Sequence, residues 1–274
     1  MRKTIIQIYE VQRPAEAAAV VALGVDQVGS VLLSGAKWKE PGIRKTVRAV
    51  QRAGAVSVLI PLFSDPVTLF HALDYYQPDI VHFCEALAIL PDDKARVVRE
   101  FDSLLTLQID VRDRFPQIEI MRSLPVPRPG MARENEILKN IFTFAELLAP
   151  FSDYFLIDTV VGGPGIVANE PVAGYIGITG EAGDWNMAGA ISKWSPIPVI
   201  LAGGISSQNV YDAIIKLEPA GVDSCTKTNI VDNKGRPVRF KKDLEKVKAL
   251  VAEVRRADAA LSGIQKLEEG EAEL

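Results

Sequence analysis

Short apolar runs alternate with longer segments of helical periodicity along the whole chain. The first run, Thr4 to Tyr9, is followed by an alanine-rich segment, Pro14 to Leu23, which ends at Gly24 as helices often do. The same order of an apolar run and then a helical segment returns seven more times. This alternation predicts parallel strands that are joined by helices.

The alternation predicts eight strands and eight helices. The strands are expected at residues 4–9, 26–33, 56–61, 79–84, 118–123, 154–158, 198–202 and 222–225. The helices are expected at residues 14–23, 43–53, 66–75, 92–115, 135–148, 185–194, 206–217 and 241–260. Eight regular units in one chain favour a single-domain α/β protein, a (β/α)8 barrel of the TIM type over residues 1–260, over a doubly wound open sheet. The acidic tail, residues 261–274, is expected to fray.

Composition and charge argue against several classes of protein. The net charge is −4 and no lysine- or arginine-rich stretch stands out, which argues against a nucleic-acid partner. No apolar run reaches the ~18 residues of a membrane helix, and the N-terminal segment has too few apolar residues for a secretion signal. The two cysteines, Cys84 and Cys225, have no CxxC spacing, which disfavours a disulfide framework and a structural zinc site. We therefore expect a cytoplasmic protein without a membrane partner.

A glycine pair marks the clearest candidate site. The seventh predicted strand runs into Gly203 and Gly204, and Ser206 or its neighbour is placed to cap the next helix. In a barrel, sites form at the carboxyl ends of strands, and bare glycines near a helix start let a phosphate approach backbone N–H groups. The loop after the eighth strand adds Thr226 and Lys227 as further donors. The pattern favours a phosphate site over a simple tight turn.

Other strand ends also carry polar side chains. Asp158 ends the sixth strand, where apolar surroundings raise a carboxyl pKa and suit a general acid; a helix cap or an ion pair is the alternative. His82 and Cys84 lie two apart on the fourth strand and face the same way, which favours interior packing over metal ligation. Tyr9 and Glu10 end the first strand.

Four stretches of the chain resemble phosphoribosylanthranilate isomerase, a tryptophan-pathway barrel. They are IIQIYEVQRPAEAAAVVALGVDQVGSVL, FLIDT, GITGEAGDW and ILAGGISSQNVYDAI. The corresponding family forms are close to KICGIT with an alanine-rich helix and GADAVGFVF, then LLD, GGTGKTFDW and LAGGLNPENV. The stretches occur in the same order, with insertions around the fourth helix and before Thr179. The resemblance covers nearly the whole chain.

The resemblance implies an Amadori rearrangement, in which an aspartate acid assists opening of a ribose ring and a cysteine base removes a proton from the adjacent carbon. The aspartate matches Asp158, but Tyr9 stands where the family has the cysteine. A phenol with a pKa of ~10 is a poor base at neutral pH. The base is therefore expected to be recruited from Glu10, Cys84 or His82.

The resemblance also implies binding residues. Lys37 is the nearest match to the arginine that meets the anthranilate carboxylate in the family, and it keeps the charge without the bidentate fork. Gly203 and Gly204 match the family's phosphate loop directly, while Thr179 and Gly180 match its threonine-glycine pair. His82 and Cys84 complete the expected substrate contacts.

We therefore expect an isomerase that acts on a phosphoribosyl amine or a related sugar phosphate, as a monomer or a homodimer. The resemblance implies no organic cofactor and no metal. The alternatives are a diverged phosphosugar-binding barrel that runs an epimerase or lyase reaction, and a non-catalytic protein that binds a phosphorylated metabolite.

Overall fold

The chain folds as the predicted barrel in the computed structural model, which describes residues 3–87, 94–130, 133–160, 174–177 and 180–272. Eight parallel strands close on themselves in chain order, because β1 pairs with both β2 and β8. The strands are β1 (Ile5–Ile8), β2 (Gln27–Leu32), β3 (Val56–Pro61), β4 (Ile80–Phe83), β5 (Glu119–Pro127), β6 (Tyr154–Val160), β7 (Val199–Leu201) and β8 (Gly221–Ser224). The (β/α)8 prediction is confirmed, and the open-sheet alternative is wrong.

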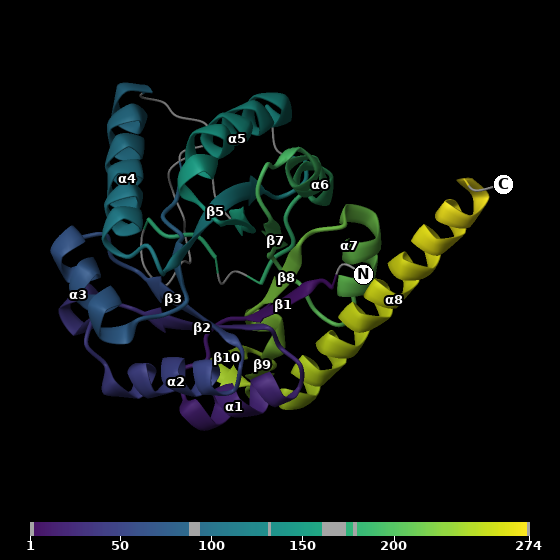
Figure 1. Cartoon of the computed structure of the whole chain (residues 1–274), viewed down its shortest axis with the longest axis horizontal. Coiled ribbons are helices and arrows are strands. Elements are labelled where there is room, and N and C mark those ends of the chain that lie inside the picture. Colours follow the sequence, from purple (N-terminus) through teal and green to yellow (C-terminus); the bar gives the residue numbers. More distant parts are fainter. Residues whose placement is uncertain (1–2, 88–93, 131–132, 161–173, 178–179, 273–274) are drawn as a thin grey trace.

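Helices surround the barrel (Figure 1). They are α1 (Pro14–Ala22), α2 (Pro41–Arg52), α3 (Pro66–Tyr76), α4 (Lys94–Arg114), α5 (Glu134–Leu148), α6 (Trp185–Trp194), α7 (Val210–Leu217) and α8 (Leu244–Ala272). The predicted end of the last helix near Ala260 is wrong, because α8 continues to Ala272 and projects beyond the barrel (Figure 1). Within the described ranges, no helix is long and apolar enough to cross a membrane.

The core has two apolar layers. Strand side chains that point inward fill the barrel itself, among them Val31, Val58, Ile80, Met121, Leu156 and Ile200. The outward side chains of the strands pack under the helices, as do Ile6, Leu124, Phe155 and Val222. This alternation is the period of two expected of strands that are covered on both faces.

The start of α7 differs from the prediction. The sequence places Ser206 at the helix start as a cap, but the helix begins at Val210, and the preceding N-cap residue Asn209 makes no side-chain cap hydrogen bond. Instead, Asn209 accepts a hydrogen bond from the Ser206 N–H at 2.8 Å and donates one to the Gly204 carbonyl at 3.1 Å. The asparagine therefore stabilises the turn that precedes the helix.

Strand β5 is longer than predicted, because its two prolines do not end it. It stays in register with β6 as far as Pro127, which pairs with Val160. The N–H of Glu119 donates to the Asp79 carbonyl, just before β4. Pro125 and Pro127 lie an even number of residues after Glu119, so their backbone nitrogens also point to the β4 side. Strand β4 ends at Phe83, so the missing proline N–H groups cost no ladder hydrogen bond.

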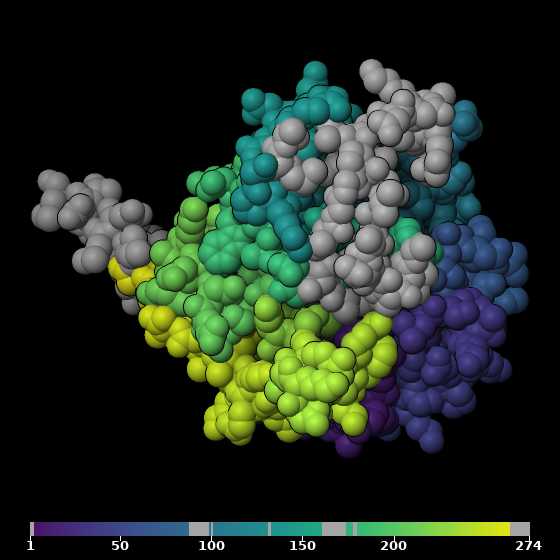
Figure 2. Space-filling model, turned by 180° about the vertical axis from the view of Figure 1, so that it is seen from behind, coloured from purple at the N-terminus to yellow at the C-terminus, as the bar shows by residue number. Residues whose placement is uncertain are grey.

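A hairpin that the sequence did not predict lies between β8 and α8. It consists of β9 (Asn229–Val231) and β10 (Pro237–Lys242), which pair antiparallel. In Figure 2 its yellow-green residues lie beside the purple N-terminal part of the chain. Short, half-exposed strands carry little hydrophobic periodicity, which explains why the pattern missed them.

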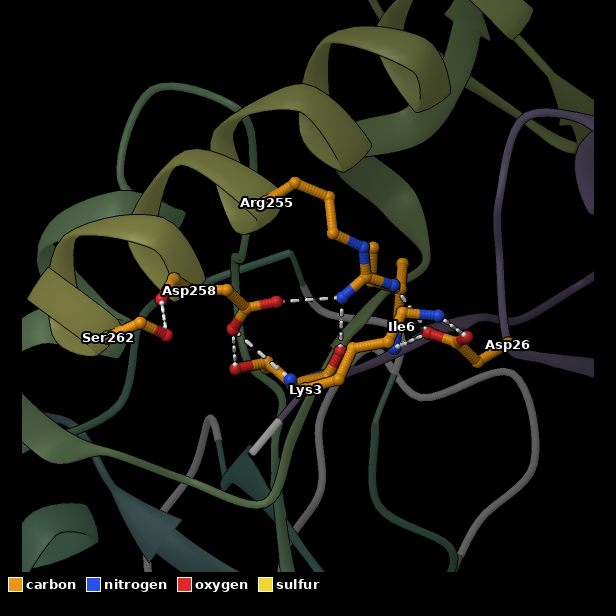
Figure 3. Close-up of polar contacts among 7 residues, drawn as sticks. Lys3, Ile6, Asp26, Arg255, Asp258 and Ser262 are labelled. Carbon is orange, nitrogen blue, oxygen red and sulfur yellow. Dashed lines mark hydrogen bonds and ion pairs between the residues drawn. The ribbon is translucent and has the colours of Figure 1, made fainter. Parts of the chain in front are cut away.

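A polar network ties α8 to the start of the barrel (Figure 3). Arg255 donates to the Thr4 carbonyl at 2.7 Å, to Asp258 at 2.9 Å and to Asp26 at 2.8 Å. Asp26 also accepts from the Ile6 N–H at 2.9 Å, and Asp258 accepts from the Thr4 hydroxyl at 2.6 Å. One arginine thus joins β1, β2 and the last helix at the end of the barrel where the strands begin.

We expect Arg255→Met to lower the free energy of unfolding by about 1.5–3 kcal/mol, the range for hydrogen bonds to charged groups. Burial raises the pKa of Asp26, but its bonds to Lys3, the Ile6 N–H and Arg255 outweigh this and lower the pKa overall. A carboxyl whose pKa is lowered by folding stabilises the folded protein at pH values above the ordinary aspartate pKa. This stabilisation is lost as pH falls through the lowered pKa. Urea unfolding at neutral and acid pH would show the difference shrinking in acid. Lys248→Met, an exposed α8 position, is the control, and an equal loss there would contradict the prediction.

Candidate active site

Two adjoining clefts open at the carboxyl ends of the strands. The larger, which we name the apolar cleft, encloses about 510 Å³, and its apolar walls include Val31, Ile60, Leu62 and Leu156. The smaller, which we name the glycine cleft, encloses about 280 Å³ and is lined by Gly180, Gly203, Gly204, Ile205, Thr226 and Lys227. Both clefts are also lined by the same three side chains, Asp158, Asp223 and Cys225. A ligand that fills both clefts must pass these three groups.

The glycine cleft depends on the absence of two side chains. Gly203 and Gly204 have φ of 82° and 68°, values that favour glycine. A Cβ on Gly203 would lie 2.3 Å from the Thr159 hydroxyl oxygen, and one on Gly204 would lie 3.0 Å from the Ala182 nitrogen. The bare backbone therefore lets three loops meet, and exposed Lys227 adds a positive charge at their edge. This geometry suits an anion such as phosphate.

We expect Gly203→Ala to weaken the binding of inorganic phosphate at least about tenfold, which is about 1.4 kcal/mol. The added methyl group would displace Thr159 and widen the cleft. Titration calorimetry measures the loss directly. Gly42→Ala is the matched control, because a Cβ there meets nothing within 4 Å. Equal phosphate affinity in both variants would show that the glycine cleft is not the anion site.

Two carboxyl groups, those of Asp158 and Asp223, line both clefts. Burial raises the pKa of Asp158 to about 6, although the Thr159 N–H donates to its Oδ1 at 2.7 Å and lowers it. Burial and the charge of Asp158 raise the pKa of Asp223 well above its usual range, against the lowering effects of Gln7 and Lys242. Such a pair holds a proton at a pH where ordinary carboxyls have lost theirs. The pair can therefore supply a general acid.

A hydrogen-bonded chain crosses the barrel under the apolar cleft. The Tyr9 hydroxyl lies 2.6 Å from Nδ1 of His82, and Nε2 of His82 lies 2.7 Å from the Ser123 hydroxyl. Burial and the charge of Arg122 lower the pKa of His82 to about 3, while burial and the charge of Asp223 raise the pKa of Tyr9 well above its usual range. Both groups are therefore neutral and engaged with each other, which makes either one a poor base at neutral pH.

Glu10 presents a carboxylate to the apolar cleft from the end of β1. Its φ is +62°, its side chain is 1% exposed, and its Oε1 accepts hydrogen bonds from Nε of Arg239 at 2.6 Å and from Nη2 of the same residue. Its buried Oε2 has no hydrogen-bond partner within the described part of the chain. Cys84 is buried in the same cleft. Glu10 thus has one oxygen held by Arg239 and one buried oxygen without a partner in the described ranges.

Some predicted site residues lie elsewhere, and others were missed. Lys37 is exposed in a short 3-10 helix, Gly35–Lys37, and is not among the described residues that line either cleft. Thr179 lies outside the described residues. Asp223 and Arg239 were missed: Asp223 shares a strand face with Cys225, a usable signal, whereas Arg239 lies in a hairpin without one.

Metal ligation has no support in the described ranges, where no three His, Cys, Asp or Glu side chains come together as a metal site.

The fold and the clefts define a (β/α)8 barrel with an acidic pair beside an anion-sized glycine cleft. No family model matches the chain. Curated relatives are nevertheless named N-(5'-phosphoribosyl)anthranilate isomerase: one from Dechloromonas aromatica is 27% identical over 265 residues, which cover 94% of this chain and 100% of that one. Isomerase 1 of Methanosarcina mazei is 28% identical over 177 residues, 64% of this chain and 68% of the relative. The alignment to the Methanosarcina acetivorans relative covers 65% of that protein's length.

Solved structures share the fold at low identity. The N-(5'-phosphoribosyl)anthranilate isomerase of Pyrococcus furiosus superposes with a TM-score of 0.62 at 17% identity, over 92% of this chain and 99% of that one. A phosphoribosyl anthranilate isomerase in complex with reduced 1-(o-carboxyphenylamino)-1-deoxyribulose 5-phosphate has a TM-score of 0.58 at 15% identity, over 92% and 98% of the two chains. The resemblance found in the sequence is therefore confirmed: the chain is similar to phosphoribosylanthranilate isomerases.

Proposed function

We propose that this protein catalyses the isomerisation of N-(5'-phosphoribosyl)anthranilate, an Amadori rearrangement of an aldose to a ketose in tryptophan biosynthesis. The observation that carries the proposal is the position of Asp158, whose pKa of about 6 belongs to a group that lines both clefts. A substrate with its phosphate in the glycine cleft and its aromatic ring in the apolar cleft has its ribose beside that carboxyl. The names of the relatives support the same substrate.

Each chemical step moves a proton between the substrate and a side chain. Asp158 donates its proton to the ribose ring oxygen, the bond from that oxygen to C1 breaks, and C1 becomes doubly bonded to the anthranilate nitrogen. A base then removes the proton from C2, whose electron pair forms a double bond to C1 while the C1–nitrogen π pair returns to nitrogen. The C2 hydroxyl of this enolamine then gives its proton to the Asp158 carboxylate, and C1 takes up the proton held by the base. C2 is now a ketone, C1 is a methylene group, and both side chains have regained their starting protonation. No atom is gained or lost overall, so the reaction needs no oxidant or reductant.

Among the base candidates, Glu10 fits the geometry best. His82 has both ring nitrogens in hydrogen bonds and a pKa of about 3. Cys84 is a buried thiol that lines the apolar cleft, and a cysteine reacts through its thiolate form. Glu10 has a buried oxygen that no described residue occupies. We therefore assign proton abstraction at C2 to Glu10, which takes the role that the resemblance gives to a cysteine at position 9.

The binding groups follow from the same placement. The phosphate lies against Gly180, Gly203 and Gly204 with Thr226 and Lys227 beside it, and Tyr9, His82 and Cys84 border the other half of the substrate. Neither cysteine forms a disulfide, which fits a cytoplasmic protein. A monomer or a homodimer is proposed. The comparisons do not favour an epimerase, a lyase or a non-catalytic binding protein.

Complementation tests the function in a cell. A bacterial strain that lacks phosphoribosylanthranilate isomerase should grow without tryptophan when it expresses this chain, and should not grow when it expresses the Asp158→Asn variant at the same level. Asp74→Asn, an exposed position on α3, is the control that should support growth. Failure of the unaltered, well-expressed chain to support growth would contradict the proposal.

A further inference from the structure

The β9–β10 hairpin is fastened to the mouth of the barrel. Buried Lys242, at the end of β10, donates from Nζ to the Cys225 carbonyl at 2.8 Å and to the Asn229 side chain at 2.6 Å. The backbone N–H of Lys242 donates to Glu16 on α1 at 2.9 Å. The hairpin is thus held both to the loop after β8 and to the first helix, so the side chains at its centre have a fixed position over β1.

Arg239 uses that position to reach Glu10. Its Nε and Nη2 both donate to Oε1 of Glu10, and its guanidinium lies 4.7 Å from the centre of the Phe240 ring. Phe240 has a φ of +60°, an uncommon value for a bulky residue that turns the chain here. The arginine is 33% exposed while the carboxylate is 1% exposed, so the arginine approaches from the rim and the carboxylate lies within the cleft.

The two carboxylate oxygens of Glu10 differ in their contacts, because Oε1 accepts hydrogen bonds from Arg239 and Oε2 has no hydrogen-bond partner in the described ranges. Two of the three guanidinium nitrogens of Arg239 and the Cys225 thiol interact with Glu10, yet Oε2 is buried and without a hydrogen-bond partner in the described ranges. A buried carboxylate oxygen without a partner costs stability, and so does a positive φ at a residue with a side chain. A base that receives a proton from carbon needs an oxygen that no other group occupies.

We infer that Arg239 is a positioning residue of the active site: it holds Oε1 of Glu10 so that Oε2 faces C2 of the substrate. This inference rests on the proposed function, since it presupposes that Glu10 removes the proton. The hairpin then has a catalytic purpose, because it brings an arginine to a residue 229 positions earlier in the chain. Arg239 itself does not touch the reacting atoms.

Steady-state kinetics on four variants test the inference. Arg239→Gln should lower kcat about 10- to 100-fold with KM changed less than about threefold, because a misplaced base slows the chemical step more than binding. Arg239→Lys should recover part of kcat, since it restores one donor and the charge. Glu10→Gln should lower kcat at least about 100-fold, and adding Arg239→Gln to it should cost no more than about twofold further, because the arginine acts through the glutamate. Melting temperatures show that each variant is folded.

Arg236→Gln is the matched control, since Arg236 lies in the same hairpin but pairs with Asp232 at an exposed position. It should keep the kcat of the unaltered protein. If Arg239→Gln also keeps it, or if the losses of Arg239→Gln and Glu10→Gln multiply, the inference is wrong while the proposed function stands. If the unaltered protein does not convert phosphoribosylanthranilate, the proposed function falls and takes the inference with it.

Discussion

Replacing Asp158 by asparagine should lower kcat for the isomerisation by about 100- to 10,000-fold, the usual contribution of a general acid. Asparagine has nearly the same shape, and its side-chain oxygen can still accept the Thr159 N–H bond. What it lacks is the proton for the ribose ring oxygen. The loss should therefore appear in kcat, while KM and the affinity for inorganic phosphate stay within about threefold.

The pH dependence of the rate is a second test of Asp158 as the general acid. The acid must be protonated to act, so the rate should fall as pH rises through about 6, the pKa of Asp158. The residual activity of Asp158→Asn should lack this descent. Asp74→Asn should keep both the rate and the descent. An Asp158→Asn variant with the rate and pH profile of the unaltered protein would show that Asp158 is not the acid.

The raised pKa of Asp158 also means that its ionised carboxylate destabilises the folded protein. A carboxyl whose folded-state pKa exceeds its unfolded value destabilises the protein as pH rises from the unfolded value toward about 6. At pH 7 the asparagine variant should therefore unfold with a free energy higher by up to about 3 kcal/mol. Urea unfolding at neutral and acid pH would show this gain shrinking in acid.

Gly29→Ala should be the most destabilising of the changes considered, with a loss of about 3 kcal/mol or more in the free energy of unfolding, at the upper end for overpacking. A Cβ on Gly29 would lie 1.8 Å from Cδ1 and 2.0 Å from Cε1 of Tyr9. Tyr9 cannot swing aside easily, because it is 5% exposed and its hydroxyl is bonded to His82. Gly29 itself is fixed by the pairing of β2 with β3.

Replacing Tyr9 should offset part of the destabilisation that Gly29→Ala causes. Tyr9→Ala removes the ring that the new methyl group strikes, so the double variant should be less destabilised than the sum of the two single variants by more than about 1 kcal/mol. Gly42→Ala is the control and should cost little, because its Cβ meets nothing within 4 Å. Additive losses at Gly29 and Tyr9 would mean that the tyrosine ring does not occupy the position described for it.

The barrel could be predicted because its signals are local. Runs such as Val56–Pro61 and Tyr154–Val160 are mostly buried and mostly apolar, and they alternate with segments of helical periodicity. Local signals alone made the predicted β5 too short, because it was predicted to end at residue 123, before Pro125 and Pro127. Whether a proline ends a strand depends on which neighbour its nitrogen faces, and that is decided by the partner strand.

Among the site residues too, those with a local sequence signal could be predicted and those without one could not. Asp158, Gly203 and Gly204 were found because each follows an apolar strand directly, and barrel strands deliver such residues to one rim. Arg239 was missed because its meaning lies in a contact with Glu10, which no periodicity reports. Lys37 was expected as the nearest match to an arginine of the resembled family, and the structure leaves it exposed outside the lining of the clefts.

The most direct measurement follows carbon-13 at ribose C1 of freshly made phosphoribosylanthranilate by NMR, with a catalytic amount of purified protein. The account predicts that the anomeric signal is replaced by a methylene signal, as C1 of the ketose requires, far faster than without protein and not with the Asp158→Asn variant. An anomeric signal that decays at the spontaneous rate, or that turns into free ribose phosphate, would contradict the account.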